Sequence, residues 1–360
     1  MKLIIAAGGT GGHIYPGIAV ANEVMLRDET SEVLFVGTAR GLEKRIVPEN
    51  GYQLALINSA GLKNVGVMGK VRGLMVLPRS FVESRKILKE FDPDVVVGAG
   101  GYVSGPVVMT AHFMGYPTLL MDSNALPGFT NRQLARFVDK AALSFEAALR
   151  FFGKKGIVTG NPVRKQFFDV AERSSQAPIS LLIFGGSQGA RAINDAVIEA
   201  LSLLKAAYSD GFNITHQTGE NNFDEVRGKY QSSGLTNADV RPYISNMVEA
   251  FDRADIIICR AGATTCAEIA AAGKASIMIP FPGAADDHQR KNAEAMAVNG
   301  AAKMVLQSDL SGERLAAEIE QLVNNPETIV EIGRAARTMA RRDAAEATVD
   351  LIEDLIRKKV

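Results

Sequence analysis

Two glycine-rich segments of similar sequence lie about half a chain apart, and each follows a short apolar run. Residues 4–12 read IIAAGGTGG and residues 182–189 read LIFGGSQG. An apolar run, a glycine-rich turn and then helical periodicity are typical of a strand–turn–helix junction in a parallel sheet. A second pair of junctions, at 95–101 and 256–262, repeats with a similar offset. The sequence therefore predicts an α/β fold with two similar Rossmann-like domains in tandem.

Length, charge and cysteine content narrow the class of protein. A chain of 360 residues is long enough for two domains, and its 40 basic and 40 acidic residues leave no net charge to attract a nucleic acid. Cys259 and Cys266 fit no disulfide framework and no zinc pattern, which favours a reducing cytoplasm. No apolar stretch approaches the roughly 18 residues of a membrane span. We therefore expect a cytoplasmic protein that does not bind nucleic acid.

The domain boundary is expected near residues 160–164, because Pro162 disfavours helix at the residue before it. This places one domain at 1–162 and the other at 163–340. Residues 331–360 are predicted to be helical, with Val349, Ile352 and Ile356 on one stripe. No strand follows this helix, so we expect it to pack back across the domain junction.

The first glycine loop has the composition of an anion site. Glycines let backbone N–H groups converge, and the start of the following helix adds partial positive charge, so residues 8–12 can hold a diphosphate. Ile14 stands where the dinucleotide fingerprint needs its last glycine, which argues against a nicotinamide cofactor. The same positive charge favours a neutral imidazole, so His13 is a candidate general base. The alternatives are glycines that serve only a tight turn and a histidine that caps its own helix.

The second glycine loop also matches G-x-S-x-G, the nucleophile elbow of α/β hydrolases. Ser187 would then be the nucleophile, with His288 as base and Asp255 or Asp239 as acid. His216 reads as the end of a strand. The elbow leaves unexplained why the first domain repeats the junction with threonine in place of serine. The hydrolase is therefore the rival hypothesis.

Residues 260–268, RAGATTCAE, begin at a strand end and enter a helix. Free N–H groups at 263–265 suit an anion, and Glu268 one turn further suits a ribose diol, so a single nucleotide can reach both. Residues 286–288, DDH, follow the strand at 277–279. Because adjacent residues rarely converge on one ion, we expect them to contact a hydroxylated ligand and not a metal.

Residues 70–82 mix apolar and basic side chains in a way that suits shallow contact with an anionic membrane surface. The residues concerned are Lys70, Arg72, Leu74, Met75, Leu77, Arg79 and Phe81. The alternative is an ordinary helix that buries its apolar side chains within the domain.

Five motifs, in order and across nearly the whole chain, resemble the MurG family. These are the UDP-N-acetylglucosamine:N-acetylmuramyl-(pentapeptide) pyrophosphoryl-undecaprenol N-acetylglucosaminyltransferases. The motifs are GGTGGH at 8–13 with YPG at 15–17, GGYVSGP at 100–106, GNPVR at 160–164, GGSQGAR at 185–191 and residues 260–273. The resemblance implies a GT-B fold, in which two Rossmann-like domains face a cleft and a terminal helix, about 341–360, returns to the first domain.

The resemblance also implies an activity. It is the transfer of N-acetylglucosamine, with inversion, from UDP-N-acetylglucosamine to the 4-hydroxyl of the muramyl sugar of lipid I. The product is lipid II, used in peptidoglycan synthesis. No tightly bound cofactor is implied, and the need for a divalent ion stays open. A non-catalytic protein that binds a nucleotide sugar or a lipid on the same scaffold is the remaining alternative.

Individual roles follow from the same resemblance. The donor would lie mainly on domain 163–340, with Ile244 at uracil, Glu268 at ribose, and Ser187 with Ala263, Thr264 and Thr265 at the diphosphate. The sugar would be held by Asn124, Arg164 and Gln289. Domain 1–162 would bind the acceptor pyrophosphate through Thr10, Gly11 and Gly12, with His13 as base or orienter and Tyr102 lining the cleft. Residues 70–82 would contact the cytoplasmic face of the membrane, where lipid I resides. Asp122 stands where the family frequently has glutamate, so it is a shorter acid.

Overall fold

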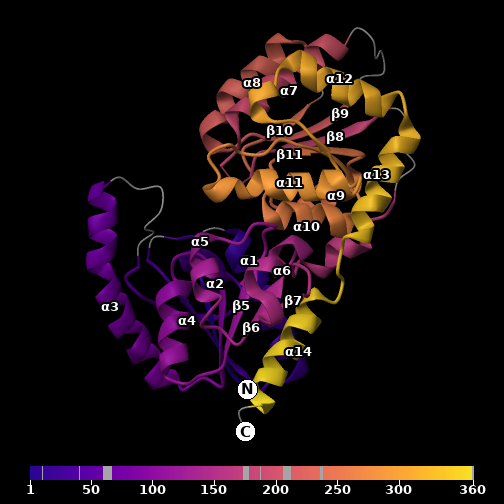
Figure 1. Ribbon diagram of the computed structural model, residues 1–360. Helices are drawn as coiled ribbons and strands as arrows, with labels where there is room; N and C mark the ends of the chain where they lie inside the picture. The colour runs from indigo at the N-terminus through magenta and orange to yellow at the C-terminus, as the bar shows by residue number, and fades with distance from the viewer. Residues whose placement is uncertain are drawn as a thin grey trace. The chain divides into compact units, whose positions relative to one another are not determined.

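The computed structural model describes residues 1–9, 11–39, 41–59, 67–172, 178–186, 188–205, 212–235 and 238–358, without the side chains of 67–75. Contacts divide the chain into two compact units (Figure 1). Unit 1 comprises 1–163 with 341–360, and unit 2 comprises 164–340. Each unit is built on a parallel β-sheet flanked by helices. The prediction of an α/β chain with two Rossmann-like domains is therefore confirmed.

The sheet of unit 1 has seven parallel strands in the order β3-β2-β1-β4-β5-β6-β7. Their bounds are β1 Lys2–Ala7, β2 Glu32–Gly37, β3 Gln53–Leu56, β4 Val95–Gly100, β5 Thr118–Asp122, β6 Lys140–Leu143 and β7 Gly156–Val158. The chain runs outward from β1 in one direction and from β4 in the other, so the order reverses between β1 and β4. Ligands of open parallel sheets bind at the carboxyl ends of strands beside such a reversal.

Alternate residues of β1 point to opposite faces of this sheet and meet different helices. Leu3 and Ile5 pack in one core with α1, α2 and α14, whereas Ile4 and Ala6 pack in another with α3 to α6. The helices are α1 Gly11–Arg27, α2 Glu43–Glu49, α3 Val67–Phe91, α4 Ser104–Phe113, α5 Phe129–Leu134, α6 Leu149–Phe152 and α14 Ala344–Arg357. Among the described residues of both units, no helix combines the length and apolarity that a bilayer span requires.

The sheet of unit 2 has six parallel strands in the order β10-β9-β8-β11-β12-β13, with the reversal between β8 and β11. The strands are β8 Ser180–Phe184, β9 Asn213–Gln217, β10 Asp239–Arg241, β11 Ile256–Cys259, β12 Ala275–Met278 and β13 Lys303–Met304. The helices are α7 Arg191–Leu204, α8 Phe223–Ser232, α9 Met247–Arg253, α10 Ala263–Ala272, α11 His288–Val298, α12 Gly312–Val323 and α13 Pro326–Thr338. Short 3-10 turns complete the connections, among them η3 Lys165–Asp169 and η5 Ala285–Asp287.

Residues 331–360 are largely helical as predicted, but two helices share the segment, and the terminal helix expected at about 341–360 corresponds to α14. Helix α13 ends at Thr338 within unit 2, and α14 begins at Ala344 within unit 1. The chain passes between units here, so one continuous helix does not form. The predicted stripe does pack inward, since Val349 and Ile352 are fully buried and Ile356 packs beside them against the core of unit 1.

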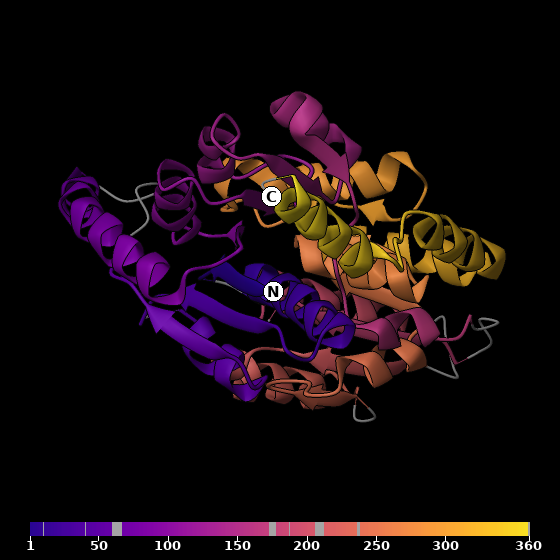
Figure 2. The same ribbon diagram turned by 90° about the horizontal axis from the view of Figure 1, so that it is seen from below.

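Helix α14 lies along α1 and is tied to it by Arg27 (Figure 2). The Arg27 guanidinium bonds to Asp350 at 2.7 Å and Glu353 at 3.2 Å on α14, and to Glu23 at 3.1 Å on its own helix. It also donates to the Glu346 carbonyl oxygen at 3.1 Å. Burial by itself lowers the pKa of Arg27, but these acceptors outweigh it and the pKa is raised.

We expect Arg27→Ala to lower the free energy of unfolding by about 1 to 3 kcal/mol, because several charge-assisted hydrogen bonds are lost together. Arg357→Ala is the matched control, since Arg357 is 74% exposed and contacts Glu353 at 3.4 Å. Its effect should stay within about 0.5 kcal/mol. Urea unfolding measures both, and equal losses in the two variants would contradict the proposed clamp.

Candidate active site

Two loops meet at the strand-order reversal of unit 1, one after β1 and one after β4. Gly101 lies against the carbonyl group of Gly8, and Gly100 lies against the imidazole of His13, so closely that a Cβ on either glycine would collide. Both glycines have positive φ, +115° at Gly100 and +78° at Gly101, which side chains disfavour. Tyr102 follows in the same loop, about one contact distance from Gly9. The predicted residues His13 and Tyr102 therefore share one edge of the sheet.

The imidazole of His13 has a defined orientation on the first turns of α1. Its Nδ1 lies 3.2 Å from the carbonyl oxygen of Gly8. Because a carbonyl only accepts hydrogen bonds, Nδ1 carries the proton and Nε2 carries the lone pair of the neutral ring. The Gly9 N–H donates to Glu43 Oε2 at 3.0 Å, so this N–H points into the protein. The Gly9 N–H is therefore directed away from the ligand expected at the loop, whose predicted contacts are Thr10, Gly11 and Gly12.

Asp122 and Asn124 lie at the same carboxyl edge, after β5. The buried Asp122 carboxylate accepts hydrogen bonds from the Asn124 N–H at 2.9 Å, the Gly128 N–H at 3.2 Å and the Asn131 amide at 2.8 Å. Burial raises the pKa of Asp122, while these donors and the charge of His13 act in the opposite direction. The loop is thus folded around one carboxylate, and Asn124 is placed near it.

In unit 2, the loop after β8 contains Gly186 and Gly189, both with positive φ. A buried residue that the sequence analysis missed, Gln217 at the end of β9, connects this loop to the Ile244 backbone. Its Nε2 donates to the Gly186 carbonyl oxygen at 2.9 Å, and its Oε1 accepts from the Ile244 N–H at 2.8 Å. The Gln217 side chain therefore connects the loop expected to contact the diphosphate with the Ile244 backbone, which is expected to contact the uracil.

Helix α10 begins directly after the carboxyl end of β11. The N–H groups of Ala263, Thr264 and Thr265 belong to its first turn, where a helix has no acceptors of its own to offer. Among the described residues, the buried hydroxyl of Thr264 has no hydrogen-bond partner. Donors without partners and a partial positive charge make this helix start suitable for an anion.

Glu268 and Arg164 are brought together one turn into α10. The Arg164 Nη2 lies 3.4 Å from Glu268 Oε1, and the guanidinium is 4.8 Å from the centre of the Phe167 ring. Burial raises the pKa of Glu268 to about 7, although the charge of Arg164 opposes this. A carboxylate in this setting is poorly supplied with hydrogen-bond donors, and ligand hydroxyl groups can supply them.

The segment before α11 has two residues in a strained backbone conformation, and Gln289 follows in the first turn of the helix. Asp286 and Asp287 both have φ of 56°, a left-handed conformation that is unusual outside glycine. The Gln289 Oε1 accepts from the Phe281 N–H at 3.0 Å, and His288 Nδ1 bonds to the Ala285 carbonyl oxygen at 2.7 Å. Within the described ranges, no three His, Cys, Asp or Glu side chains gather so as to hold a metal ion.

Several predicted residues fall outside what the structure describes. Thr10 and Ser187 are not described, and Lys70, Arg72, Leu74 and Met75 lie on α3 without described side chains. Of the remaining residues of that segment, Leu77 and Phe81 are half-buried and Arg79 is exposed, 2.8 Å from Glu83.

The geometry argues against the hydrolase hypothesis. Asp255 accepts from the Ser180 N–H at 2.8 Å, at the amino ends of β8 and β11, whereas the G-x-S-x-G loop follows the carboxyl end of β8. Asp255 and this loop therefore lie at opposite edges of the sheet. His216 is fully buried, with Nδ1 2.9 Å from the Tyr230 hydroxyl and Nε2 3.0 Å from Asn194 Oδ1. Burial lowers the pKa of His216 to about 3, so it is a neutral core residue.

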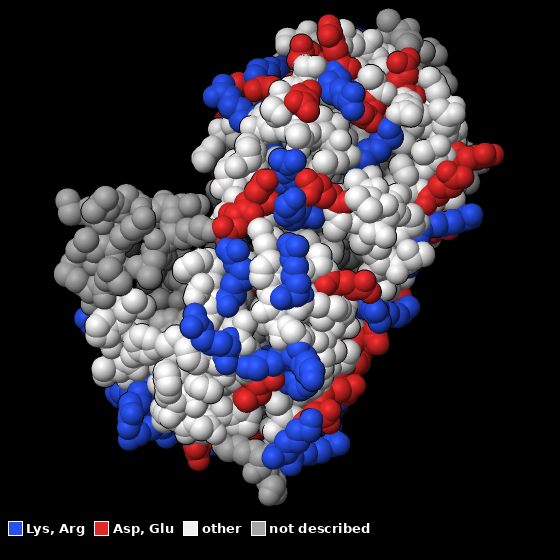
Figure 3. All heavy atoms as spheres, viewed as in Figure 1, with Lys and Arg blue, Asp and Glu red and all other residues white. Residues whose placement is uncertain are grey.

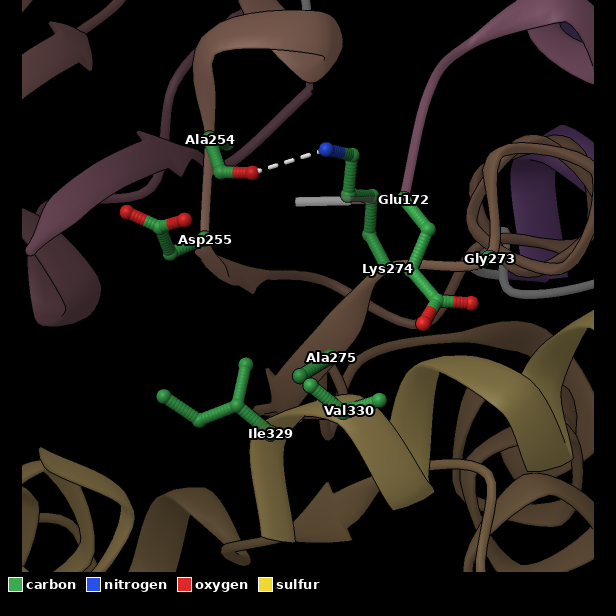
Figure 4. Close-up of a pocket in the computed structure, with 8 residues that line it drawn as sticks. All are labelled: Glu172, Ala254, Asp255, Gly273, Lys274, Ala275, Ile329 and Val330. Carbon is green, nitrogen blue, oxygen red and sulfur yellow. Dashed lines mark hydrogen bonds between the residues drawn. The ribbon is translucent and has the colours of Figure 1, made fainter. Parts of the chain in front are cut away.

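A small cavity of about 20 Å³ lies at the amino ends of β11 and β12 (Figure 4). Lys274 is buried beside it and donates to the carbonyl oxygens of Ala254 at 3.0 Å and Asp252 at 3.3 Å. A space of this size holds about one water molecule. Lys274 therefore stabilises the loops at the edge of the sheet opposite the glycine loop.

Residues 3–143 match the glycosyltransferase family 28 N-terminal domain, and residues 180–348 match the family 28 C-terminal domain. Two relatives are named UDP-N-acetylglucosamine–N-acetylmuramyl-(pentapeptide) pyrophosphoryl-undecaprenol N-acetylglucosamine transferase. The protein of Geotalea uraniireducens is 48% identical, covering 97% of each chain, and that of Geobacter sulfurreducens is 47% identical, covering 100% of each.

Solved structures of known proteins are also similar to this chain. The crystal structure of Acinetobacter baumannii MurG has a TM-score of 0.79 and 32% identity, covering 98% of this chain and 99% of that one. UDP-GlcNAc 2-epimerase from Neisseria meningitidis has a TM-score of 0.71 at 14% identity, covering 98% of this chain and 100% of that one. The second likeness concerns the fold alone.

Gly100→Ala should destabilise unit 1 more than Gly115→Ala. Both positions have positive φ, but a Cβ at Gly115 meets nothing within 4 Å, whereas one at Gly100 meets the His13 ring. The control should cost about 1 kcal/mol from backbone strain alone, and Gly100→Ala should cost about 1 to 3 kcal/mol more. Thermal unfolding compares the two, and equal melting temperatures would show that the contact with His13 is loose.

Proposed function

Because the chain belongs to the MurG family of family 28 glycosyltransferases, we propose that it transfers N-acetylglucosamine from UDP-N-acetylglucosamine to the muramyl sugar of lipid I, giving lipid II. The observation that carries this function is the similarity to transferases of that name over the full length of both chains. A second line of support is that each unit has a glycine loop at its strand-order reversal, and the reaction joins two pyrophosphate-bearing substrates.

In this proposal the donor is bound mainly by unit 2, and Asn124 is the one donor contact from unit 1. The uracil contacts the Ile244 backbone, the ribose hydroxyls donate to Glu268, and the diphosphate lies at the start of α10 beside Ser187. Arg164, Gln289 and Asn124 contact the sugar. The orphaned Thr264 hydroxyl and the first-turn N–H groups support the diphosphate position, because negative charge develops there when UDP leaves.

Unit 1 binds the acceptor through Thr10, Gly11 and Gly12, with Tyr102 beside them. The 4-hydroxyl oxygen attacks the anomeric carbon, the bond from that carbon to the UDP oxygen breaks, and the hydroxyl proton passes to Nε2 of His13. This single displacement inverts the anomeric centre. The Nδ1 contact to Gly8 supports the assignment, because it leaves the lone pair on Nε2.

Lipid I is anchored in a membrane, so the proposal includes peripheral contact between unit 1 and the cytoplasmic leaflet. Residues 129–155 contain six Lys and Arg against two Asp and Glu, and Figure 3 shows basic side chains gathered over unit 1. Exposed Arg136 and Arg150 lie over the rings of Phe137 and Phe151, at 5.5 and 4.9 Å. Basic and aromatic groups together suit an anionic interface, and residues 70–82 of α3 add apolar ones.

His13→Ala should lower kcat by about 10²- to 10⁴-fold and leave the UDP dissociation constant unchanged, because the base and the donor site lie on different units. Radiolabelled UDP-N-acetylglucosamine with a lipid I analogue measures turnover, and calorimetry measures UDP binding. Wild-type protein that binds both substrates and forms no product would support the non-catalytic alternative. Unchanged turnover in the variant would remove His13 from the mechanism.

UDP binding should weaken as pH falls below about 7. The pKa of Glu268 is about 7 in the free protein, and the ionised form accepts hydrogen bonds from both ribose hydroxyls. Binding therefore favours the deprotonated state, and the dissociation constant should rise toward about tenfold per pH unit on the acid side. Calorimetry at pH values below and above 7 should show this change of the UDP dissociation constant in wild type and in Glu320→Gln, an exposed control on α12. It should be lost in Glu268→Gln, and a flat wild-type profile would exclude this role.

A further inference from the structure

A buried carboxylate lies beneath the first glycine loop and was not among the predicted site residues. Glu43, at the start of α2, is fully buried. Its Oε1 accepts from the N–H and the hydroxyl of Thr38, at 2.8 and 2.9 Å, and its Oε2 accepts from the Gly9 N–H at 3.0 Å. A Cβ at Gly37 or Gly41 would collide with its side chain. The surrounding backbone is thus shaped to admit this one carboxylate.

The Gly8–Gly9 peptide group connects Glu43 to His13. Its N–H, from Gly9, donates to Glu43, and its carbonyl oxygen, from Gly8, accepts from Nδ1 of His13. A peptide N–H bonded to an anion makes the carbonyl oxygen of the same peptide a stronger acceptor, because hydrogen bonds in a chain polarise one another. Gly101 packs against this peptide from the other side and limits its rotation.

We propose that Glu43 is a positioning residue for the transfer reaction, acting on His13 through the Gly8–Gly9 peptide. It holds the imidazole in the tautomer whose Nε2 takes the acceptor proton, and its charge stabilises the imidazolium that results. No proton moves to or from Glu43, and the peptide N–H keeps its proton throughout. The proposal rests on the proposed role of His13 as base.

Asp122, the last residue of β5, is a further charged group that interacts with His13. Its carboxylate is bonded to donors of the loop that follows β5, whereas Glu43 is bonded to the peptide that holds the imidazole. Asp122 therefore adds to the field at the ring, and Glu43 sets the orientation. Asp122→Asn should shift the pH profile and leave the tautomer unchanged.

The kinetic test is Glu43→Gln. This change removes the negative charge, and it places the side-chain NH₂ group of glutamine against a hydrogen-bond donor, either the Gly9 N–H or Thr38. We expect kcat to fall about 10- to 100-fold, as when a histidine loses its outer partner. The acidic limb of the kcat profile should move to lower pH, and the UDP dissociation constant should stay unchanged. Glu23→Gln, at another buried glutamate of unit 1, is the matched control and should keep wild-type kcat.

The two hypotheses fail separately. If His13→Ala keeps its turnover, the proposed base is wrong. If His13→Ala loses turnover and Glu43→Gln keeps both its kcat and its pH profile, the base stands and the inference about Glu43 is wrong. In the His13→Ala background, Glu43→Gln should cause no further loss of kcat, and an additional loss of the same size would assign Glu43 to an independent role.

A spectroscopic measurement covers the case in which Glu43→Gln folds poorly. The chain has only four histidines, so the ¹⁵N imidazole signals of labelled wild-type protein are assignable by single replacement. We expect a His13 ring protonated at Nδ1 in wild type, and a population protonated at Nε2 in Glu43→Gln. A wild-type ring protonated at Nε2 would overturn the proposal without any variant.

Discussion

The close approach of one backbone loop to another, at the carboxyl edge of each sheet, is the constraint on which both candidate binding regions depend. In unit 1, Gly101 touches the Gly8 carbonyl group. In unit 2, Gly189 touches the Thr218 carbonyl group and Gly219 touches that of Gln188. All of these glycines have positive φ. A single Cβ at such a point would push the loops apart, and the residues that follow them would lose their positions.

The glycines therefore allow close packing of the loops as well as turns of the chain. Not every polar backbone group of these loops is directed at a ligand. In unit 1, the Gly9 N–H is bonded to Glu43. In unit 2, the Gly186 carbonyl oxygen and the Ile244 N–H are bonded to Gln217. Each loop thus keeps some polar groups for a ligand and uses others to fix its own shape. Preorganised groups of this kind stabilise developing charge without reorganising during the reaction.

The sequence predicted the parts of this arrangement that depend on local pattern. Apolar runs marked the central strands, glycines marked the loops after β1, β4, β8 and β11, and the spacing of Val349 and Ile352 marked the buried face of α14. Glu43 and Gln217 could not be found in this way, because the contacts that connect Glu43 to Gly9, and Gln217 to Gly186 and Ile244, are with backbone groups far along the chain, and their neighbours carry no unusual composition. Glu43 is the first residue of α2, and its role becomes evident only in the fold, where the Gly9 N–H lies within hydrogen-bond distance of its carboxylate. The break between α13 and α14 was missed for a related reason, since both helices share one periodicity and only the passage between units separates them.

Three carboxylates with little exposure to solvent, Glu43, Asp122 and Glu268, show how the supply of donors separates positioning from binding. Burying a charge is costly unless hydrogen bonds replace the lost water. Three donors satisfy Glu43, and three satisfy Asp122, all from the protein itself. Glu268 has one long contact to Arg164, and burial raises its pKa to about 7. A carboxylate that the protein has already satisfied gains little from a ligand, so it acts by holding its neighbours. A carboxylate left short of donors gains most when ligand hydroxyls arrive, and this difference supports the proposed ribose contact of Glu268 and the proposed orienting role of Glu43.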